Sequence, residues 1–591
     1  MEKQSENIIE KTFTRSGTLL QKKFYSYLVP TVIMNLALSL GVVVDGIIVG
    51  NILGTDAFSA VNICAPVLYF LSALYALFGV GGSTIAARLK GAMDNDLADK
   101  IFTLSIAGLI VISCLTGFFC FIFSDLISGL LSGGSRLNEL VKTYFTVLSL
   151  GIPFLITVPG ALYFIRTDSN PKLAANILIL ANALNLGFDL VFMGVFKMGI
   201  GGAGLATVLG YVLGGFLGIK YFKSKTRTFK FVKIKKSDLK FYSSVISTGI
   251  PSALAGATVF VKNFAINIIL LKTLGPGGVA MFAVCLNTLA VSGIIIGGTA
   301  QTLVPLLGCT FGEKDYSGIR LIMKTAALTV SGLCIFMVLI FTAFPEYIAM
   351  IFGIKSAGLM EPLKSAIRIF SLSLPFFGLN FVMICYFQTI NRKLLSSVSI
   401  ILENIVFILP LVILMEKFTG EKGIWVSFIL AEILTLGTVF IVSFIIRKKS
   451  SKNLSPFLLL EDIDAKIFDV TIDSSIENAA GISDEIIKFC IKNKISPKRA
   501  NYAGLIAEEL TANIVRFGKE KKTKSFIDVR LSISKNEIVL RIRDDGVPFN
   551  PVLYIKKQGS IDSIGLNLVN KMAKKFDYTY ALNFNNTAVV L

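Results

Sequence analysis

The chain has 591 residues, of which 54% are hydrophobic and 16% are charged, a balance that excludes a soluble enzyme and indicates many membrane spans. Its net charge of +20 at pH 7 does not indicate nucleic-acid binding, because the basic residues gather in alternate loops between apolar runs. The sequence contains no histidine, which excludes a Ser-His-Asp triad and most zinc chemistry.

A polar N-terminal segment, 1–24, is followed by about twelve apolar runs, each long enough to cross a bilayer as a helix. We expect an all-α polytopic bundle with an N-lobe at 25–222, a basic loop at 223–240 and a C-lobe at 241–447. Lys and Arg follow every second run, so both termini and the basic loop are expected on the cytoplasmic side of the cell membrane. The runs lie at 25–52, 57–88, 99–124, 141–166, 173–195, 201–222, 241–273, 278–311, 320–344, 363–388, 394–416 and 423–447.

Proline and glycine recur along the chain at a nearly constant spacing. This spacing indicates two copies of a six-helix unit, and an even number of helices per copy makes the two repeats parallel. Transporters built from such repeats bind substrate between the halves, near the middle of the membrane. The pairs that lie 221 residues apart are Pro30 and Pro251, Gly54 and Gly275, and Gly91 and Gly312, and those 222 apart are Pro153 and Pro375, and Gly201 and Gly423.

The first apolar run contains one ionisable residue, Asp45. A carboxylate in hydrocarbon costs several kcal/mol unless it is protonated, paired or in contact with water, so this acid predicts a cation or proton site. The alternative is that Asp45 lies near the helix end and reaches the lipid headgroups.

A second acid, Asp189, lies in the fifth run, four residues after Asn185, so the two side chains share a helix face. Together with Asp45 and the hydroxyl of Thr207, they would supply oxygens for a hard monovalent cation, or for a proton held between carboxylates. Hydrogen bonding between helices without ion binding is the alternative for Asn185 and Asp189.

The order of several segments resembles the MATE (multidrug and toxin extrusion) transporters. The matching segments include VVVDGIIVGNILGTDAFSAVNICAPV, GGSTIAARLKGAMDNDLADK and TGIPSALAGATVFVKNFAINIILLKTLG, and the resemblance covers about residues 15–450. It implies an antiporter that exports small organic, and in part cationic, drugs and toxins in exchange for H⁺ or Na⁺. The family's first-half cation site corresponds to Asp45, Asn185, Asp189, Ala203 and Thr207.

The second half departs from the pattern of those family members that carry an acid early in the seventh helix. Here that helix contains only Lys262 and Lys272 as ionisable residues, so the coupling site is expected in the first half. Lys262 lies in mid-run and is a candidate partner of Glu403 or Glu432, which also lie within apolar runs. Such a pair could be structural or part of a substrate path.

A polar linker, 448–461, leads to a C-terminal part, 462–591, with the alternation of a soluble α/β domain. We expect two helices, at 482–494 and 498–517. A strand is expected at 468–472, a hairpin turn at Lys535-Asn536, and a last hairpin turn around Asn585-Asn586.

Three clusters in this tail suit phosphate chemistry. Glu509 and Asn513 share a helix face, where an amide oxygen can bind Mg²⁺ and a carboxylate can orient a nucleophile. Asp544 follows a strand and can accept a hydrogen bond from the amino group of adenine. Gly565 and Leu566 precede a helical run at 567–575, and the free backbone N–H groups at its N-terminus suit phosphate.

The order of these clusters resembles the Bergerat fold of histidine-kinase-like ATPase domains, and most closely the anti-sigma-factor serine kinases. The resemblance covers about residues 465–591 and implies an α/β sandwich that binds ATP and Mg²⁺. It assigns Glu509 as catalytic base and Asn513 as the metal ligand. Two departures, Ser563 in place of a glycine and Phe517 where histidine is common, bear on turnover more than on binding. The nucleotide-binding residues it implies are Asn513, Asp544, Gly546, Gly565 and Leu566.

The leading hypothesis is a cation-coupled multidrug efflux transporter with a cytoplasmic nucleotide-binding regulatory domain. One alternative is a membrane-anchored ATP-dependent serine protein kinase, or anti-sigma-like regulator, that acts on a cytoplasmic protein partner and uses the bundle as a sensor. A second alternative is a flippase for lipid precursors. A primary ATP pump is disfavoured, because the chain has no GxxxxGK[ST] loop.

Overall fold

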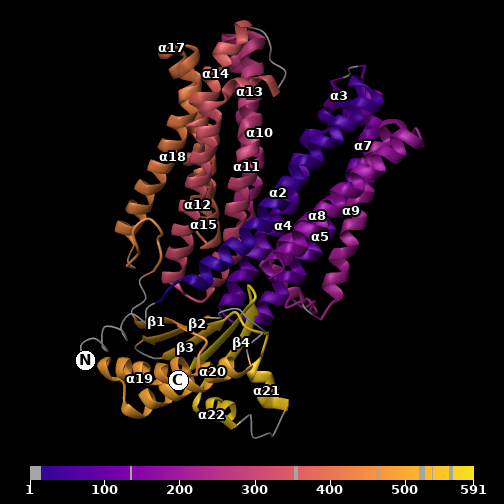
Figure 1. Cartoon of the computed structure of the whole chain (residues 1–591). Coiled ribbons are helices and arrows are strands. Elements are labelled where there is room, and N and C mark those ends of the chain that lie inside the picture. Colours follow the sequence, from indigo (N-terminus) through magenta and orange to yellow (C-terminus); the bar gives the residue numbers. More distant parts are fainter. Residues whose placement is uncertain are drawn as a thin grey trace.

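The computed structural model consists of two helical lobes and a C-terminal α/β domain that lies against one end of both lobes (Figure 1). The structure describes residues 15–133, 136–225, 227–351, 357–450, 453–461, 465–517, 526–534, 537–557 and 564–591. Most of the predicted N-terminal segment, the predicted turn at Lys535-Asn536, and Ser563 lie outside these ranges.

The N-lobe contains the first six predicted spans. Its helices are α2 (Thr18–Leu53), α3 (Thr55–Ile63), α4 (Ala65–Gly91), α5 (Asn95–Ile122), α6 (Ser124–Ser132), α7 (Asn138–Thr167), α8 (Pro171–Asp189), the π-helical turn η1 (Leu190–Val195) and α9 (Gly199–Lys223).

The C-lobe contains the other six. After the short helix η2 (Lys236–Lys240), it comprises α10 (Phe241–Thr273), α11 (Gly275–Gly312), α12 (Tyr316–Ala343), α13 (Pro345–Ile351), α14 (Ala357–Ser371), α15 (Leu374–Thr389), α16 (Lys393–Ile401), the π-helical turn η3 (Leu402–Val406), α17 (Ile408–Thr419) and α18 (Glu421–Lys449). Within the described residues, eleven helical segments are long and apolar enough to span a membrane. The 36-residue helix α2 completes the twelve that the sequence predicts.

The duplication is visible in the backbone as well as in the sequence. Gly54, just before α3, and Gly275, the first residue of α11, both have positive φ angles, 90° and 68°, a conformation that a side chain would strain. The loops after α4 and α11 match too, because Asp94 and Asp315 each cap the next helix through a backbone N–H three residues on. The repeated residues are therefore those that fix where each helix ends and the next begins.

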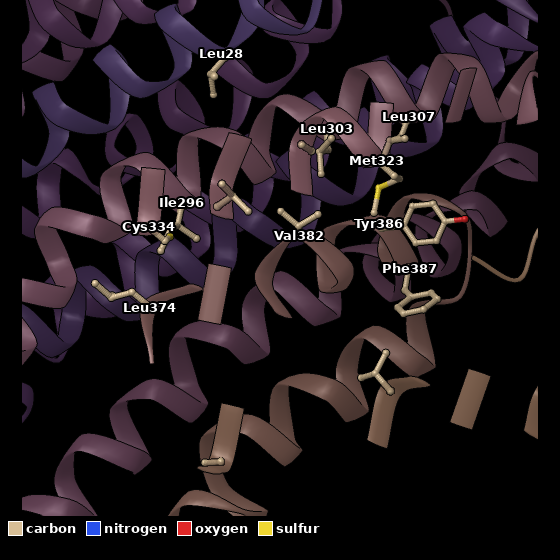
Figure 2. Close-up of a cluster of buried hydrophobic side chains, with 14 of the residues drawn as sticks. Leu28, Ile296, Leu303, Leu307, Met323, Cys334, Leu374, Val382, Tyr386 and Phe387 are labelled. Carbon is tan, nitrogen blue, oxygen red and sulfur yellow. The ribbon is translucent and has the colours of Figure 1, made fainter. Parts of the chain in front are cut away.

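Helix α2 joins the two lobes. Its first half packs into the buried cluster of the C-lobe, where Leu28 lies with Leu303 of α11 and Val382 of α15 (Figure 2). Its second half packs against α8 of the N-lobe. One helix thus contributes to both apolar cores, although the sequence assigns it to the N-lobe.

The two lobes meet most closely at the end that carries the C-terminal domain, here called the tail side. A Cβ atom built on Gly91 would lie 1.9 Å from the carbonyl oxygen of Cys309, and one built on Gly312 would lie 1.9 Å from that of Arg88. The crossing of α4 and α11 therefore has no room for side chains at these two repeat-related glycines. Away from the tail, the ribbons of the lobes diverge (Figure 1).

The C-terminal domain, here called the tail, is an antiparallel five-stranded sheet in the order β1-β2-β3-β5-β4. Val470, Val529 and Leu540 on the sheet pack with α19 and α20 in one core, and the opposite face lies against the lobes (Figure 1). The elements are β1 (Ala465–Asp473), α19 (Ile476–Lys492), α20 (Pro497–Phe517), β2 (Phe526–Ser534), β3 (Ile538–Asp544), α21 (Pro551–Lys557), α22 (Ile564–Met572), β4 (Lys575–Ala581) and β5 (Phe584–Val590).

One predicted turn is misplaced. The last hairpin turns at Leu582 and Asn583, which both have positive φ angles, and not at Asn585-Asn586. Asn585 and Asn586 lie within β5, paired with Tyr580 and Thr579 of β4. Adjacent asparagines favour a turn locally, but here their side chains are buried and hydrogen-bonded within the sheet, which outweighs that preference.

Candidate functional site

The predicted acids of the N-lobe lie together. Asp45 on α2 and Asp189 at the end of α8 have side chains within hydrogen-bonding contact of each other, and Asp189 is 0% exposed. In the described part of the chain, no donor reaches Asp45 Oδ1 or either Asp189 oxygen when both groups are ionised. A shared proton, or a bound cation, would supply what these oxygens lack.

The local helix geometry aims Asp189 at this point. The α-helical pattern of α8 ends at Asp189, and the wider π-helical turn η1 begins at the next residue. Such π turns inside helices are frequent at functional sites, because they rotate the following side chains relative to those before them.

The other three predicted residues form a hydrogen-bonded chain beside the acids. Asn185 Nδ2 donates to Thr207 Oγ1 at 3.3 Å, and Thr207 Oγ1 donates to the carbonyl oxygen of Ala203 at 3.1 Å. Asn185 precedes Asp189 by one turn of α8, so the chain and the acid pair share that helix. The structure thus brings all five predicted residues to one region between α2, α8 and α9.

Tyr144 on α7 also belongs to this region, and the sequence analysis missed it. Its buried hydroxyl is in hydrogen-bonding contact with Thr207 and lies within electrostatic range of Asp45 and Asp189. A tyrosine in an apolar run ordinarily packs by its ring, and no neighbouring residue marks Tyr144 as different.

The buried charges of the C-lobe form a separate cluster. Lys262 on α10 lies within electrostatic range of Glu403 in η3 and Glu432 on α18, and all three side chains are buried. Asn380 Nδ2 donates to Glu432 Oε2 at 2.8 Å and to the carbonyl oxygen of the same residue at 2.9 Å. Lys262 therefore lies near both of the glutamates that the sequence offered as its candidate partners.

In the tail, three predicted nucleotide-binding residues line one pocket. Asn513, Asp544 and Leu566 face it, together with Asn585 and Thr587 of β5. Burial raises the pKa of Asp544 to about 6, although hydrogen bonds from Asn585 Nδ2 and the backbone N–H of Gly546, both 2.9 Å long, act in the opposite direction.

The remaining predicted residues adjoin this pocket. Asn513 Nδ2 donates to the carbonyl oxygen of Glu509 at 2.7 Å, which leaves the amide oxygen of Asn513 available as a ligand. A Cβ atom on Gly565 would lie 2.1 Å from Glu509 Oε2, so the carboxylate of Glu509 packs against the first turn of α22. Gly546 borders the pocket through the backbone bond to Asp544.

Asn585 organises the pocket, and the sequence analysis had placed it in a turn. Its Oδ1 accepts from the backbone N–H of Phe549 at 3.1 Å and from the hydroxyl of Tyr578 at 2.7 Å. Its Nδ2 donates to Asp544 and, at 3.0 Å, to the carbonyl oxygen of Val547. One amide thus holds the strand end at Asp544 and the loop after it in place.

Comparison with known proteins decides the family. A sequence model of the MatE family matches residues 30–191 and 251–414, which together make up more than half of the chain. The chain belongs to the MATE family. The two matched segments begin 221 residues apart, which is the spacing of the internal repeat. A second model, of the histidine kinase-like ATPase domain, matches residues 472–590, so this MATE chain carries such a domain at its C-terminal end.

Relatives of the MATE part include multidrug exporters. The multidrug export protein MepA of Staphylococcus aureus, strain MRSA252, is 22% identical over 411 residues, which are 69% of this chain and 90% of that protein. MepA of Staphylococcus saprophyticus is 23% identical over 406 residues, 68% of this chain and 88% of that protein.

Solved structures share the fold of the two lobes. An outward-facing multidrug resistance MATE transporter of the MOP superfamily has a TM-score of 0.65 and 22% identity, covering 72% of this chain and 96% of its own. The Vibrio cholerae MATE transporter VcmN, in a mutant form, has a TM-score of 0.69 and 17% identity, covering 74% and 99%. These matches confirm the expected all-helical membrane bundle, and the matched ATPase domain confirms the expected α/β tail.

Proposed function

We propose that this MATE-family protein exports small organic molecules across the cell membrane in exchange for H⁺ or Na⁺. The observation that carries the proposal is the pair of carboxyl groups Asp45 and Asp189, of which Asp45 Oδ1 and both Asp189 oxygens are buried and lack donors among the described residues. The relatives named multidrug export proteins support the class of substrate. Both termini and the loop 223–240 are assigned to the cytoplasm on their basic charge.

The position of Asp45 suggests how ion binding acts on the lobes. Asp45 lies on the half of α2 that packs on the N-lobe, while the half around Leu28 packs on the C-lobe. An ion can drive transport only if it binds the two conformations of the protein with different affinity. Bound between Asp45 and Asp189, it would hold α2 against α8, and its release would let α2 change its path between the lobes.

The tail is proposed to bind ATP with Mg²⁺ and to regulate transport. Two observations support this ligand: the buried acid Asp544, which could accept a hydrogen bond from an adenine amino group, lines a pocket, and Asn513 lines the same pocket. No group of three or more Cys, Asp or Glu among the described residues is arranged to hold a metal by itself. Asn513 would therefore share Mg²⁺ with phosphate oxygens, as is usual for this ion. Glu509 stays the proposed catalytic base.

Dye efflux from proteoliposomes under imposed pH and Na⁺ gradients tests the transporter. We expect Asp45→Asn to lower gradient-driven efflux roughly tenfold or more, since the coupling ion then loses one of its two carboxylates. The matched control is Asp56→Asn, because Asp56 is an exposed N-lobe acid paired with Arg136 at 2.9 Å. Comparing the two gradients identifies the ion. Equal efflux by Asp45→Asn and wild type would refute the proposed site.

The serine-kinase hypothesis predicts a different result for the same protein. If the tail acts as a kinase, the full-length chain incubated with labelled ATP should transfer phosphate to a protein serine, and Glu509→Gln should abolish the transfer. We favour a regulatory tail because the sheet face that α19 and α20 leave uncovered is held against the lobes by buried ion pairs. For the flippase hypothesis, the described residues offer no specific support.

A further inference from the structure

The sheet of the tail contacts the N-lobe at the loops on its tail-side end (Figure 1). Arg541 Nη1 on β3 donates to the carbonyl oxygen of Gly91, the last residue of α4, at 3.5 Å. Thr579 Oγ1 on β4 donates to Asn95 Oδ1 at 2.7 Å, and the backbone N–H of Asn583 donates to Ser169 Oγ at 3.0 Å. These contacts lie at the end of α4, at the start of α5 and just after the end of α7.

The same sheet contacts the C-lobe through buried ion pairs. Arg543 on β3 pairs with Glu313, and its Nη2 lies 3.6 Å from Asp315. Arg530 on β2 lies 3.4 Å from Asp315 and donates to the carbonyl oxygen of Lys314 at 2.9 Å. Arg15, just before α2, bridges Asp315 and Asp469 of β1 at 2.7 Å each.

Two of the contacted loops, the one after α4 and the one after α11, are repeat copies, and their charges differ. Glu313 and Asp315 in the second copy correspond to Ala92 and Asp94 in the first, where Asp94 is exposed. Burial by itself would raise the pKa of Asp315, but the hydrogen bond from Arg15 and the charges of the arginines around it hold this pKa far below its usual range. The second copy thus carries an acid that the tail uses and the first copy lacks.

These loops are also where the lobes touch. Gly91 and Gly312 end the two helices, α4 and α11, that cross without room for a side chain. Arg541 binds the carbonyl oxygen of Gly91, and Arg543 binds Glu313, the residue after Gly312. A transporter that opens on the tail side must separate these helix ends. We propose that the tail is a brace across both lobes, which holds the tail-side end closed.

Strand β3 connects this brace to the nucleotide pocket. Alternate residues of a strand point to opposite faces, so Arg541 and Arg543 face the lobes, while Asp544 faces the pocket between the sheet and its helices. An adenine bound to Asp544 would fix the end of β3 and with it the adjacent Arg543. Nucleotide therefore strengthens the brace. This link rests on the proposed nucleotide binding; the brace itself rests only on the contacts above.

Pulsed electron paramagnetic resonance on the full-length protein in liposomes tests the brace. Spin labels at Asp96→Cys and Arg320→Cys, two exposed positions at the tail-side ends of α5 and α12, report the distance between the lobes. The background is Cys114→Ser, because Cys114 is the exposed cysteine among the described residues. We expect one short distance with a non-hydrolysable ATP analogue and Mg²⁺, and a second, longer one that grows when nucleotide is removed.

Two variants remove the brace by different routes. Glu313→Ala gives the second loop the alanine that the first copy has, and Arg543→Gln removes the same ion pair from the tail. Each should raise the ratio of long to short distances roughly tenfold. Adding Glu313→Ala to Arg543→Gln should change the ratio little further, because the Arg543–Glu313 pair is already lost in Arg543→Gln, which also loses the contact with Asp315. Lys488→Gln, an exposed charge on α19, is the matched control.

Two results would overturn the proposal. A distance distribution in Glu313→Ala and Arg543→Gln identical to wild type would refute the brace, while normal binding of a fluorescent ATP analogue would show that the tail is folded. If the nucleotide binds but the distance distribution stays the same with and without it, the link through β3 is refuted. Failure of the proposed function appears separately, as an absence of dye efflux or of nucleotide binding in wild type.

Discussion

At the scale of single residues, the proposed contact of Asp544 with adenine would make nucleotide binding depend on the protonation of this carboxyl group. The ionised carboxylate accepts a hydrogen bond from the adenine amino group more strongly than the protonated acid does, because its oxygens carry the negative charge. Burial raises the pKa of this residue to about 6. Because the pKa is raised, the carboxylate gains its proton as the pH falls through about 6, well above the usual range of an aspartate. We therefore expect nucleotide affinity to fall as the pH drops below that value, by at most roughly tenfold for each pH unit.

Titration of the full-length protein with a fluorescent ATP analogue between about pH 8 and about pH 5 measures this dependence. Asp544→Asn should bind weakly throughout and lose the pH dependence. Asp577→Asn, which removes an acid paired with Lys575 at the protein surface, should keep it. An affinity that stays constant across the range would show that Asp544 does not contact the base.

Site residues that lie close together in the sequence were easier to predict than site residues that come together only in the folded structure. Asn185 and Asp189 share a helix face, and their spacing alone predicts that they act together. Tyr144 and Asn585 reach their sites from other elements, and their local sequence resembles ordinary packing and an ordinary turn. Arg541 and Arg543 look like the solvent face of a strand, and only the docked arrangement shows their partners.

At the scale of elements, helix ends make the sharpest contacts between the lobes. Replacing Gly91 or Gly312 by alanine would place a Cβ atom 1.9 Å from a backbone carbonyl oxygen of the other lobe, where no side chain can move aside. The α4–α11 crossing must then widen, and we expect each variant to lower stability by about 1–3 kcal/mol, as overpacking does. Thermal unfolding of the purified protein, followed by circular dichroism, measures the loss.

Gly332→Ala is the matched control for this prediction. It replaces a glycine inside α12 whose Cβ would meet no atom within 4 Å, and the better helix propensity of alanine should stabilise the protein by up to about 1 kcal/mol. Unchanged stability in Gly91→Ala and Gly312→Ala would mean that the two helices do not cross this closely.

The helices of the lobes were predicted almost to their bounds, because apolar runs of this length have no other stable arrangement in a bilayer. The repeat was predicted from recurring glycines such as Gly54 and Gly275. Both have positive φ angles, a backbone conformation that favours glycine, so each copy of the repeat keeps a glycine there. The path of α2 between the lobes was not predicted. An all-round apolar helix carries no mark of which neighbour each half will pack on.

At the scale of the whole molecule, the proposed brace and the proposed ion site would act on the same equilibrium from opposite ends of α2. Arg15 lies just before α2 and is bound in the tail interface, while Asp45 lies further along the same helix, beside Asp189. Export requires the tail-side end to open and admit substrate. A ligand that stabilises the closed end therefore slows the cycle, by as much as its affinity differs between the two states.

We therefore expect Mg²⁺ and ATP on the tail side to slow gradient-driven dye efflux from proteoliposomes, by roughly five- to tenfold at saturation. In Glu313→Ala the unbraced lobes should export faster without nucleotide and respond to it little. The response should persist from about pH 7 to about pH 8, since Asp544 stays ionised and the depressed pKa of Asp315 keeps its ion pairs intact there. Efflux that accelerates with ATP, in wild type and Glu313→Ala alike, would assign the tail a driving role in place of a restraining one.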